Sequence, residues 1–156
     1  MALELPLPKQ ILTHAHWTMD RAKMSKSVGN VVDPFSTLDE FGVDTMRYYL
    51  VRDGGIKDDA DYKDAYIRGR YKHELQDGLG NLISRIMRSK KWVVNEAVQN
   101  GEVPKEPKAV DLSKAVVALP DSVAQSMDEL DPGTALRQIM NTISMVGTLY
   151  CDLRFN

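Results

Sequence analysis

The chain has 156 residues, of which 43% are apolar, and a net charge of −2. A chain of this length buries roughly two-thirds of its unfolded surface, so it can form a core without disulfides or a structural metal. The only cysteine, Cys151, has no pairing partner, and the histidines lack the Cys-x-x-Cys pair of a zinc finger. The longest apolar run is about four or five residues, far below the roughly 20 that span a bilayer, and residues 1–10 lack the pattern of a signal peptide. We therefore expect one or two small domains, no membrane span and no visible targeting signal.

The first thirty residues predict extended and irregular backbone. Pro6 and Pro8 exclude a helix and favour an extended connector. Residues 10–17 are partly β-branched and aromatic, which predicts a short strand. Residues 20–30 combine bases, serines and a glycine with little periodicity, as is typical of a loop.

Two helices are predicted next. Asp33 and Pro34 form a favourable helix start, because an acceptor at the cap precedes a proline at the first helical position, and Gly42 ends the helix. A second helix is expected over about residues 44–52, closed by a pair of glycines. The Asp-rich residues 57–61 predict a loop.

Helices also dominate the second half. Apolar residues spaced by three and four predict one long helix over residues 62–94, and residues 101–107 read as a proline-punctuated linker. A further amphipathic pattern covers residues 112–130, with a kink or break expected at Pro120. After a Pro-Gly turn, residues 136–146 carry the apolar face of a last helix.

The charge is distributed unevenly. Residues 33–64 hold nine acidic and four basic side chains, whereas residues 68–91 hold seven basic and two acidic ones. A basic segment of that density can bind a phosphate backbone by releasing its condensed counterions. The alternative is a solvated helix face without a partner.

One short motif carries chemistry, namely Lys23-Met24-Ser25-Lys26-Ser27. Two ammonium groups separated by hydroxyls can close on a polyphosphate and oppose the charge that grows on a leaving pyrophosphate. Lysine suits this role because a compact charge on a flexible stem can follow a moving phosphate. Alone, the motif also fits a solvated basic loop or a kinase target.

His14 and His16 are candidate metal ligands. His14 and His16 would point to the same side of a strand. Because no third ligand is near them in the sequence, we expect no metal site.

Residues 5–61 closely resemble the second half of the catalytic region of methionyl-tRNA synthetases, which are class I enzymes. They contain KMSKS, a G-N-V-V-D-P connection, a short helix and a G-V-D-x-x-R-Y-x-L helix in the family's order. Residues 77–85 are similar to the D-L-G-N-L-x-x-R opening of the family's anticodon-binding domain. The resemblance is strong up to about residue 91 and thin beyond it.

The resemblance implies a mainly α fold in two parts. Residues 1–61 would be a short βα segment of the catalytic region with the KMSKS loop. Residues 62–156 would be an α-helical bundle of the class I anticodon-binding type, truncated and atypical after about residue 146.

The resemblance also implies roles for single residues. ATP would be a substrate of the complete enzyme, and Lys26 would stabilise the transition state of methionyl-adenylate formation. The ATP-binding loop would consist of Lys23, Met24, Ser25, Lys26 and Ser27. Asn81 and Arg85 match the positions that read and hold the anticodon, and their spacing of four places them on one helix face.

The chain also departs from the family pattern. It has no counterpart of the nucleotide-binding first half, the HIGH-type signature or the methionine pocket, so we expect the chain alone to be inactive. Residues 147–156 do not resemble the family's proline-tryptophan segment, which suggests a splice or frame change near Gly147. Met1 resembles an internal methionine of the family, which favours a truncated gene model or a downstream start.

Three functional hypotheses follow. The first is a fragment or isoform of a methionine–tRNA ligase that binds tRNA and pairs with a complementary N-terminal half or a larger RNA–protein assembly. Its expected location is the mitochondrial matrix, with the cytoplasm as the alternative. The second is a non-catalytic RNA-binding or ribosome-associated protein. The third is a partial chain without an independent role.

Overall fold

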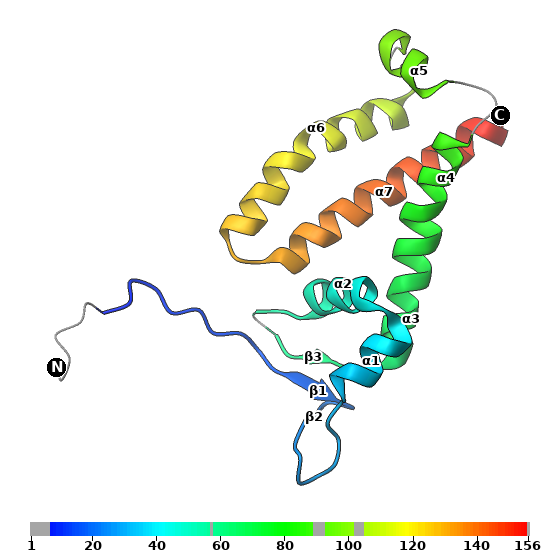
Figure 1. The fold of residues 1–156 in the computed structure, drawn as a ribbon. Helices are drawn as coiled ribbons and strands as arrows, with labels where there is room; N and C mark the ends of the chain where they lie inside the picture. The colour runs from blue at the N-terminus through cyan, green and yellow to red at the C-terminus, as the bar shows by residue number, and fades with distance from the viewer. Residues whose placement is uncertain (1–6, 57, 89–92, 102–104, 156) are drawn as a thin grey trace.

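The structure, a computed structural model, describes residues 7–56, 58–88, 93–101 and 105–155. Three short strands form one sheet, namely β1 (Trp17–Met19), β2 (Ala22–Lys23) and β3 (Ala60–Asp61). The helices are α1 (Pro34–Phe41), α2 (Val43–Asp53), α3 (Asp64–Gly69), η1 (Arg70–Gly80), α4 (Asn81–Met87), α5 (Val94–Asn100), α6 (Pro107–Asp128) and α7 (Pro132–Phe155) (Figure 1). The predicted mainly α fold is therefore confirmed.

The sheet has the strand order β2-β1-β3. Strands β1 and β2 are antiparallel, with Thr18 opposite Lys23, and β1 and β3 are parallel, with Thr18 opposite Asp61. The prediction of a strand over residues 10–17 was wrong, because the strand begins only at Trp17. The loops predicted over residues 20–30 and 57–61 contain β2 and β3. Strands this short leave no alternating pattern to detect.

A small aromatic core holds the sheet against α1, α2 and α3. Its buried members are Met46, Tyr49, Tyr62 and Ile67. The Tyr49 ring lies between two aromatic neighbours, with its centroid 5.4 Å from that of Trp17 and 6.2 Å from that of Tyr62. Met24 of the KMSKS motif packs against the same core, so one end of that motif is fixed by burial.

The predicted boundaries of the first two helices are confirmed. Asp33 caps α1, because its carboxylate accepts the N–H groups of Phe35 at 3.2 Å and Ser36 at 3.3 Å. Gly42 ends α1 with a φ of 79°, a conformation that favours glycine. Helix α2 then runs one residue beyond each predicted end.

The long helix predicted after the sheet is present from Asp64 to Met87, but it contains a π-helical stretch, η1, between α3 and α4 (Figure 1). The N–H of Asn81 donates to the carbonyl of Gln76, five residues back. A Cβ at Gly78 would lie 3.2 Å from the His73 carbonyl, also five residues back, so glycine relieves crowding in this wider turn. The helix ends at Met87 instead of at residue 94, where a separate helix, α5, begins.

Helices α6 and α7 form an antiparallel hairpin and lie side by side (Figure 1). The sequence predicts a kink or a break at Pro120. A break is wrong, because α6 continues through this residue. Pro120 has no backbone N–H to donate, and α6 packs along α7. Helix α7 also continues through Gly147 to Phe155. Residues 102–104 of the predicted linker lie outside the described residues.

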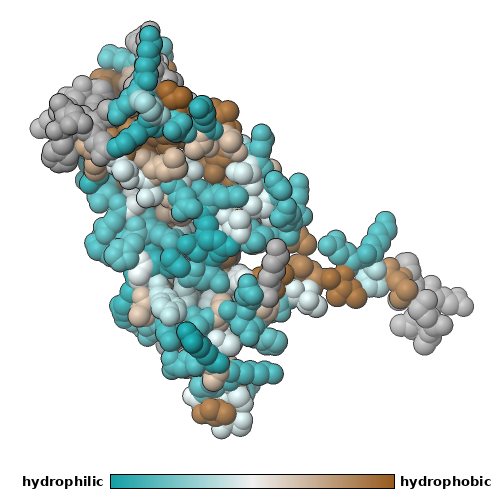
Figure 2. Space-filling view, turned by 180° about the vertical axis from the view of Figure 1, so that it is seen from behind, coloured by the Kyte–Doolittle hydropathy of each residue, from teal (hydrophilic) through white to brown (hydrophobic). Residues whose placement is uncertain are grey.

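An extended arm precedes the sheet. Leu7, Ile11 and Leu12 expose 69%, 76% and 55% of their surface on it. Figure 2 shows brown atoms along this projecting arm, whereas teal side chains cover most of the body. None of the described helices is long and apolar enough to cross a lipid bilayer.

Candidate functional site

The KMSKS loop leaves β2 and is closed by its own polar groups. The N–H of Ser25 donates to Asn30 Oδ1 at 2.8 Å, and Asn30 Nδ2 donates to the carbonyl of Lys23 at 3.2 Å. The Ser25 and Ser27 hydroxyls lie 2.8 Å apart. Gly29, with a φ of 76°, donates its N–H to the carbonyl of Ser25 at 3.1 Å. These hydrogen bonds within the loop give it a defined shape.

The two lysines of the loop face solvent. Lys23 and Lys26 are exposed, and no carboxylate of the described residues forms an ion pair with either ammonium group. Met24 is half-buried against the core. The structure thus brings the five motif residues together in a loop that packs on the core through Met24 and exposes two positively charged side chains.

Asp61 connects this loop to the rest of the sheet. Its Oδ1 accepts the N–H of Arg21 at 2.9 Å and the hydroxyl of Thr18 at 3.0 Å, and its Oδ2 lies 3.1 Å from Lys63 Nζ. The hydrogen bond from Arg21 and the contacts from Lys63 and Thr18 hold the pKa of Asp61 below its ordinary value. Sequence reasoning missed this residue, because its partners lie about forty positions earlier in the chain.

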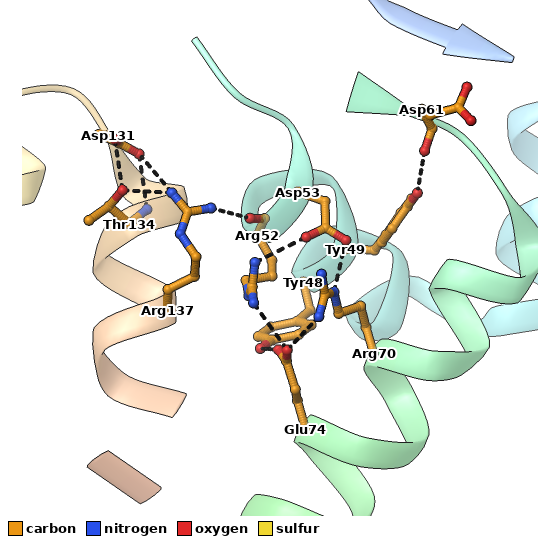
Figure 3. A network of polar contacts seen from close by, with 10 residues as sticks. All are labelled: Tyr48, Tyr49, Arg52, Asp53, Asp61, Arg70, Glu74, Asp131, Thr134 and Arg137. Atoms are coloured by element: carbon orange, nitrogen blue, oxygen red, sulfur yellow. Dashed lines mark hydrogen bonds and ion pairs between the residues drawn. The ribbon is translucent and has the colours of Figure 1, made fainter. Parts of the chain in front are cut away.

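A second polar cluster joins α2 to η1 (Figure 3). Glu74 accepts hydrogen bonds from Tyr48, from Arg52 at 3.2 Å and from Arg70 at 2.8 Å. Asp53 accepts from Arg52 at 3.1 Å and from Arg70 at 2.9 Å. Burial alone would raise the pKa of Glu74, but the Tyr48 hydroxyl and the two guanidinium groups outweigh it and lower this pKa.

The cluster extends to α7 through Arg137. This guanidinium donates to the carbonyl of Arg52 at 3.2 Å and to the hydroxyl of Thr134 at 2.6 Å. It also lies 3.8 Å from the Asp131 carboxylate. The sheet-bearing part and the α6–α7 hairpin are therefore connected by the hydrogen bond from Arg137 to Arg52 as well as by packing (Figure 3).

These ion pairs change the interpretation of the basic segment over residues 68–91. Arg68 pairs with Glu40, Arg70 pairs with Asp53 and Glu74, and Lys72 pairs with Asp77. Among the described bases of the segment, Arg85 and Arg88 have no carboxylate partner. Lys90 and Lys91 lie outside the described residues. The opposite charges of residues 33–64 and 68–91 were the available signal for the two pairs that join these segments, Arg68 with Glu40 and Arg70 with Asp53.

The two predicted anticodon residues lie on α4. Asn81 and Arg85 are both exposed, one turn apart. Arg85 Nη1 donates to Cys151 Sγ at 3.3 Å, and the guanidinium lies 5.9 Å from the centre of the Tyr150 ring. The structure therefore brings Arg85 next to the end of α7.

The histidines do not form a metal centre with other ligands. His16 Nδ1 lies 3.9 Å from Asp59 Oδ1, and both side chains are exposed. Throughout the described ranges, no three His, Cys, Asp or Glu side chains gather where they could hold a metal ion. Cys151 is a free thiol.

Comparisons with known proteins identify the family. A family model described as "tRNA synthetases class I (M)" matches residues 1–87. The probable mitochondrial methionine–tRNA ligase of Neurospora crassa is 43% identical over 153 residues, which cover 92% of this chain and 25% of that protein. The methionine–tRNA ligase of Caldanaerobacter subterraneus is 36% identical over 148 residues, which cover 92% of this chain and 22% of that protein.

A solved structure shows the same relationship. The crystal structure of Mycobacterium tuberculosis methionyl-tRNA synthetase bound by methionyl-adenylate is 28% identical, with a TM-score of 0.76, and the match covers 96% of this chain and 29% of that one. The chain spans about a quarter of the length of the curated relatives named above. On these matches in sequence and fold, the chain belongs to the methionyl-tRNA synthetase family of class I.

Proposed function

We propose that this chain supplies the KMSKS loop and the tRNA-binding helices of a methionine–tRNA ligase. The complete protein would activate methionine with ATP and transfer it to tRNA, the activity that the names of its relatives state. The observation that carries the proposal is the geometry of the loop. Lys23 and Lys26 stand free of described carboxylates, while Met24 fixes the loop to the core.

Lys26 is the proposed catalytic residue. Its exposed ammonium group can move toward the phosphates of ATP and oppose the charge that develops on the leaving pyrophosphate. Lys23 adds a second charge at the end of β2, and Ser25 and Ser27 offer hydroxyls. Met24 anchors the loop while the lysines move. No metal site is part of the proposal.

The domain assignment follows the same division. Residues 1–61 form the proposed catalytic-region segment, and residues 62–156 form the proposed anticodon-binding bundle. Asn81 and Arg85 share an exposed helix face, which supports a role in holding the anticodon loop. An amide can read base edges, and a guanidinium can stack on a base or bind a phosphate.

The proposed partners are tRNA and a complementary N-terminal half or a larger assembly. The exposed apolar arm of residues 7–12 supports the second partner, because such side chains favour burial against another surface. The proposed location is the mitochondrial matrix, as the name of the Neurospora crassa relative suggests, with the cytoplasm as the alternative.

A chimera tests the function. This chain replaces the matching quarter of the Neurospora crassa relative, and methionine-dependent exchange of pyrophosphate into ATP is measured. We expect activity, and we expect Lys26→Ala to lower kcat on the order of a hundredfold with little change in KM for methionine. Lys105→Ala, at an exposed lysine remote from the loop in sequence, is the control.

Two outcomes would contradict the proposal. An inactive wild-type chimera that is folded would show that the chain cannot supply the catalytic loop. If the 156-residue chain nevertheless binds tRNA, the result would favour the non-catalytic RNA-binding function. Full activity in the Lys26→Ala chimera would remove the catalytic role from that residue.

A further inference from the structure

The turn that leads into the KMSKS loop has an unfavourable backbone conformation. Strands β1 and β2 are joined by Asp20 and Arg21, which have φ values of 50° and 61°. Positive φ at both central residues of a two-residue hairpin loop is the signature of a type I′ turn, in which Asn-Gly and Asp-Gly are favoured. Arginine at the second position is strained, so the turn needs support from elsewhere.

A single carboxylate from β3 provides that support. Asp61 Oδ1 accepts the N–H of Arg21 at 2.9 Å and the hydroxyl of Thr18 at 3.0 Å. Asp61 Oδ2 lies 3.1 Å from Lys63 Nζ, which also lies 3.2 Å from Asp20 Oδ1. The side chain of Asp61 thus contacts the turn directly at Arg21 and, through Lys63, at Asp20.

The turn determines where the KMSKS loop begins. Lys23 is the last residue of β2 and the first of the motif, and it pairs with Thr18 across the hairpin. Asn30 Nδ2 binds the carbonyl of the same Lys23 from the other end of the loop. A change in the turn would therefore displace the start of the loop and, with it, the Lys26 ammonium group.

The side chain of Asp61 has little part in the core. The buried Tyr49 hydroxyl donates to the main-chain carbonyl of Asp61 at 2.9 Å, and the N–H of Tyr62 donates to the carbonyl of Thr18 at 2.7 Å. Both bonds use main-chain atoms of β3 or the residue after it. They survive replacement of the Asp61 side chain.

We infer that Asp61 is a positioning residue for the KMSKS loop, acting through the turn of the β1–β2 hairpin. This inference rests on the proposed function for its catalytic consequence, but its structural part stands on the contacts alone. The Asp61 side chain contacts Arg21 and Thr18 of the hairpin and Lys63. It sets the direction in which the two lysines leave the sheet.

Amide hydrogen exchange in the 156-residue chain tests the structural part. Asp61→Ala should speed exchange of the Arg21 amide about tenfold, as expected for loss of a hydrogen bond to a charged acceptor. The amides of Ala60 and Tyr62 should keep their protection, because their partners are the main-chain carbonyls of His16 and Thr18. Asp61→Asn should restore most of the Arg21 protection, since its amide oxygen can still accept both hydrogen bonds.

The chimera tests the catalytic part. Asp61→Ala should lower kcat for pyrophosphate exchange about tenfold with an unchanged KM for methionine, and Asp61→Asn should recover most of the loss. Asp58→Ala is the matched control, because Asp58 is an exposed acid on the segment before β3 without a partner among the described residues.

Three results would overturn the inference. The first is unchanged exchange at Arg21 in Asp61→Ala. The second is an equal loss of protection at Ala60 and Tyr62, which would show that Asp61 only stabilises the sheet. The third is an unchanged kcat in an active chimera. If the wild-type chimera is inactive, the proposed function fails, and the exchange experiment still decides whether Asp61 holds the turn.

Discussion

The Arg137 guanidinium donates a 3.2 Å hydrogen bond to the main-chain carbonyl of Arg52, a residue 85 positions earlier. Arg52 lies in the last turn of α2, where carbonyl groups lack helical partners and the helix dipole is negative. A cation from α7 therefore caps α2, and this contact connects the sheet-bearing part to the hairpin.

Replacing Arg137 should weaken that connection. We expect Arg137→Ala to lower the free energy of unfolding by about 1 kcal/mol, because a partly exposed guanidinium loses hydrogen bonds to a carbonyl and a hydroxyl. Urea unfolding followed by circular dichroism measures the change. Arg47→Ala, at an exposed arginine of α2 without a described partner, should leave the midpoint almost unchanged. Equal midpoints for both variants would refute the capping role.

The Glu74 cluster predicts a specific acid sensitivity. The pKa of Glu74 is lower in the folded chain than its ordinary value of 4.5, so folding favours the ionised carboxylate. Its contribution to stability is complete above about pH 4.5 and is lost as the pH falls through the lower folded value.

Glu74→Gln should remove that part of the pH dependence. The variant should be less stable than the parent at pH 7, and the difference should shrink as the pH falls below 4.5. Thermal unfolding measured from pH 7 to pH 3 gives the comparison, with Asp58→Asn as the control at an exposed acid. A constant difference across this range would mean that ionisation of Glu74 contributes nothing.

Binding of tRNA should depend on the few basic side chains that have no carboxylate partner among the described residues. Arg85→Ala and Arg88→Ala should each weaken binding and reduce the magnitude of the slope of log K against log salt by about 1. Each variant removes a basic side chain that has no described carboxylate partner. Arg70→Ala should leave that slope unchanged, since Asp53 and Glu74 already neutralise this guanidinium. Filter binding with a methionine tRNA between about 50 and 200 mM salt tests both statements. A larger change in the salt slope for Arg70→Ala than for Arg85→Ala and Arg88→Ala would show that Arg70, and not those two arginines, contacts the tRNA phosphates.

The isolated chain should not catalyse methionine-dependent exchange of pyrophosphate into ATP. A class I site forms between strand ends of a nucleotide-binding sheet and the lysine loop, and in the proposed function this chain would supply the loop. The exchange assay on purified 156-residue chain should match a blank without enzyme. Clear activity, free of any partner protein, would show that the chain binds nucleotide by itself.

Sequence reasoning located the elements whose signals are local. Asp33, Pro34 and Gly42 set both ends of α1 through capping and a left-handed glycine, and these signals act within a few residues. The strands escaped detection because their stability comes from pairing across the sheet. Trp17 and Ala60, which pair in parallel, are separated by both α1 and α2.

The site was predicted in part for the same reason. The KMSKS pentapeptide is contiguous, so its motif could be found in the sequence, and its role in catalysis stays a prediction. Asp61 and the Arg52–Glu74 pair depend on side chains brought together by folding. The π-helical stretch η1 could not be predicted from hydrophobic spacing either. A π-helical turn holds more residues than an α-helical turn, so it shifts which residues of the following helix share a face.

The parallel pairing of β1 with β3 also sets an order of events during folding. The Thr18 hydroxyl and the Asp61 carboxylate are 43 positions apart, so their contact closes a loop that contains both α1 and α2. During synthesis on the ribosome, the turn at Arg21 must therefore wait for residue 61 to leave the exit tunnel. The loop that carries the lysines therefore gains the support of Asp61 only after β3 has been made.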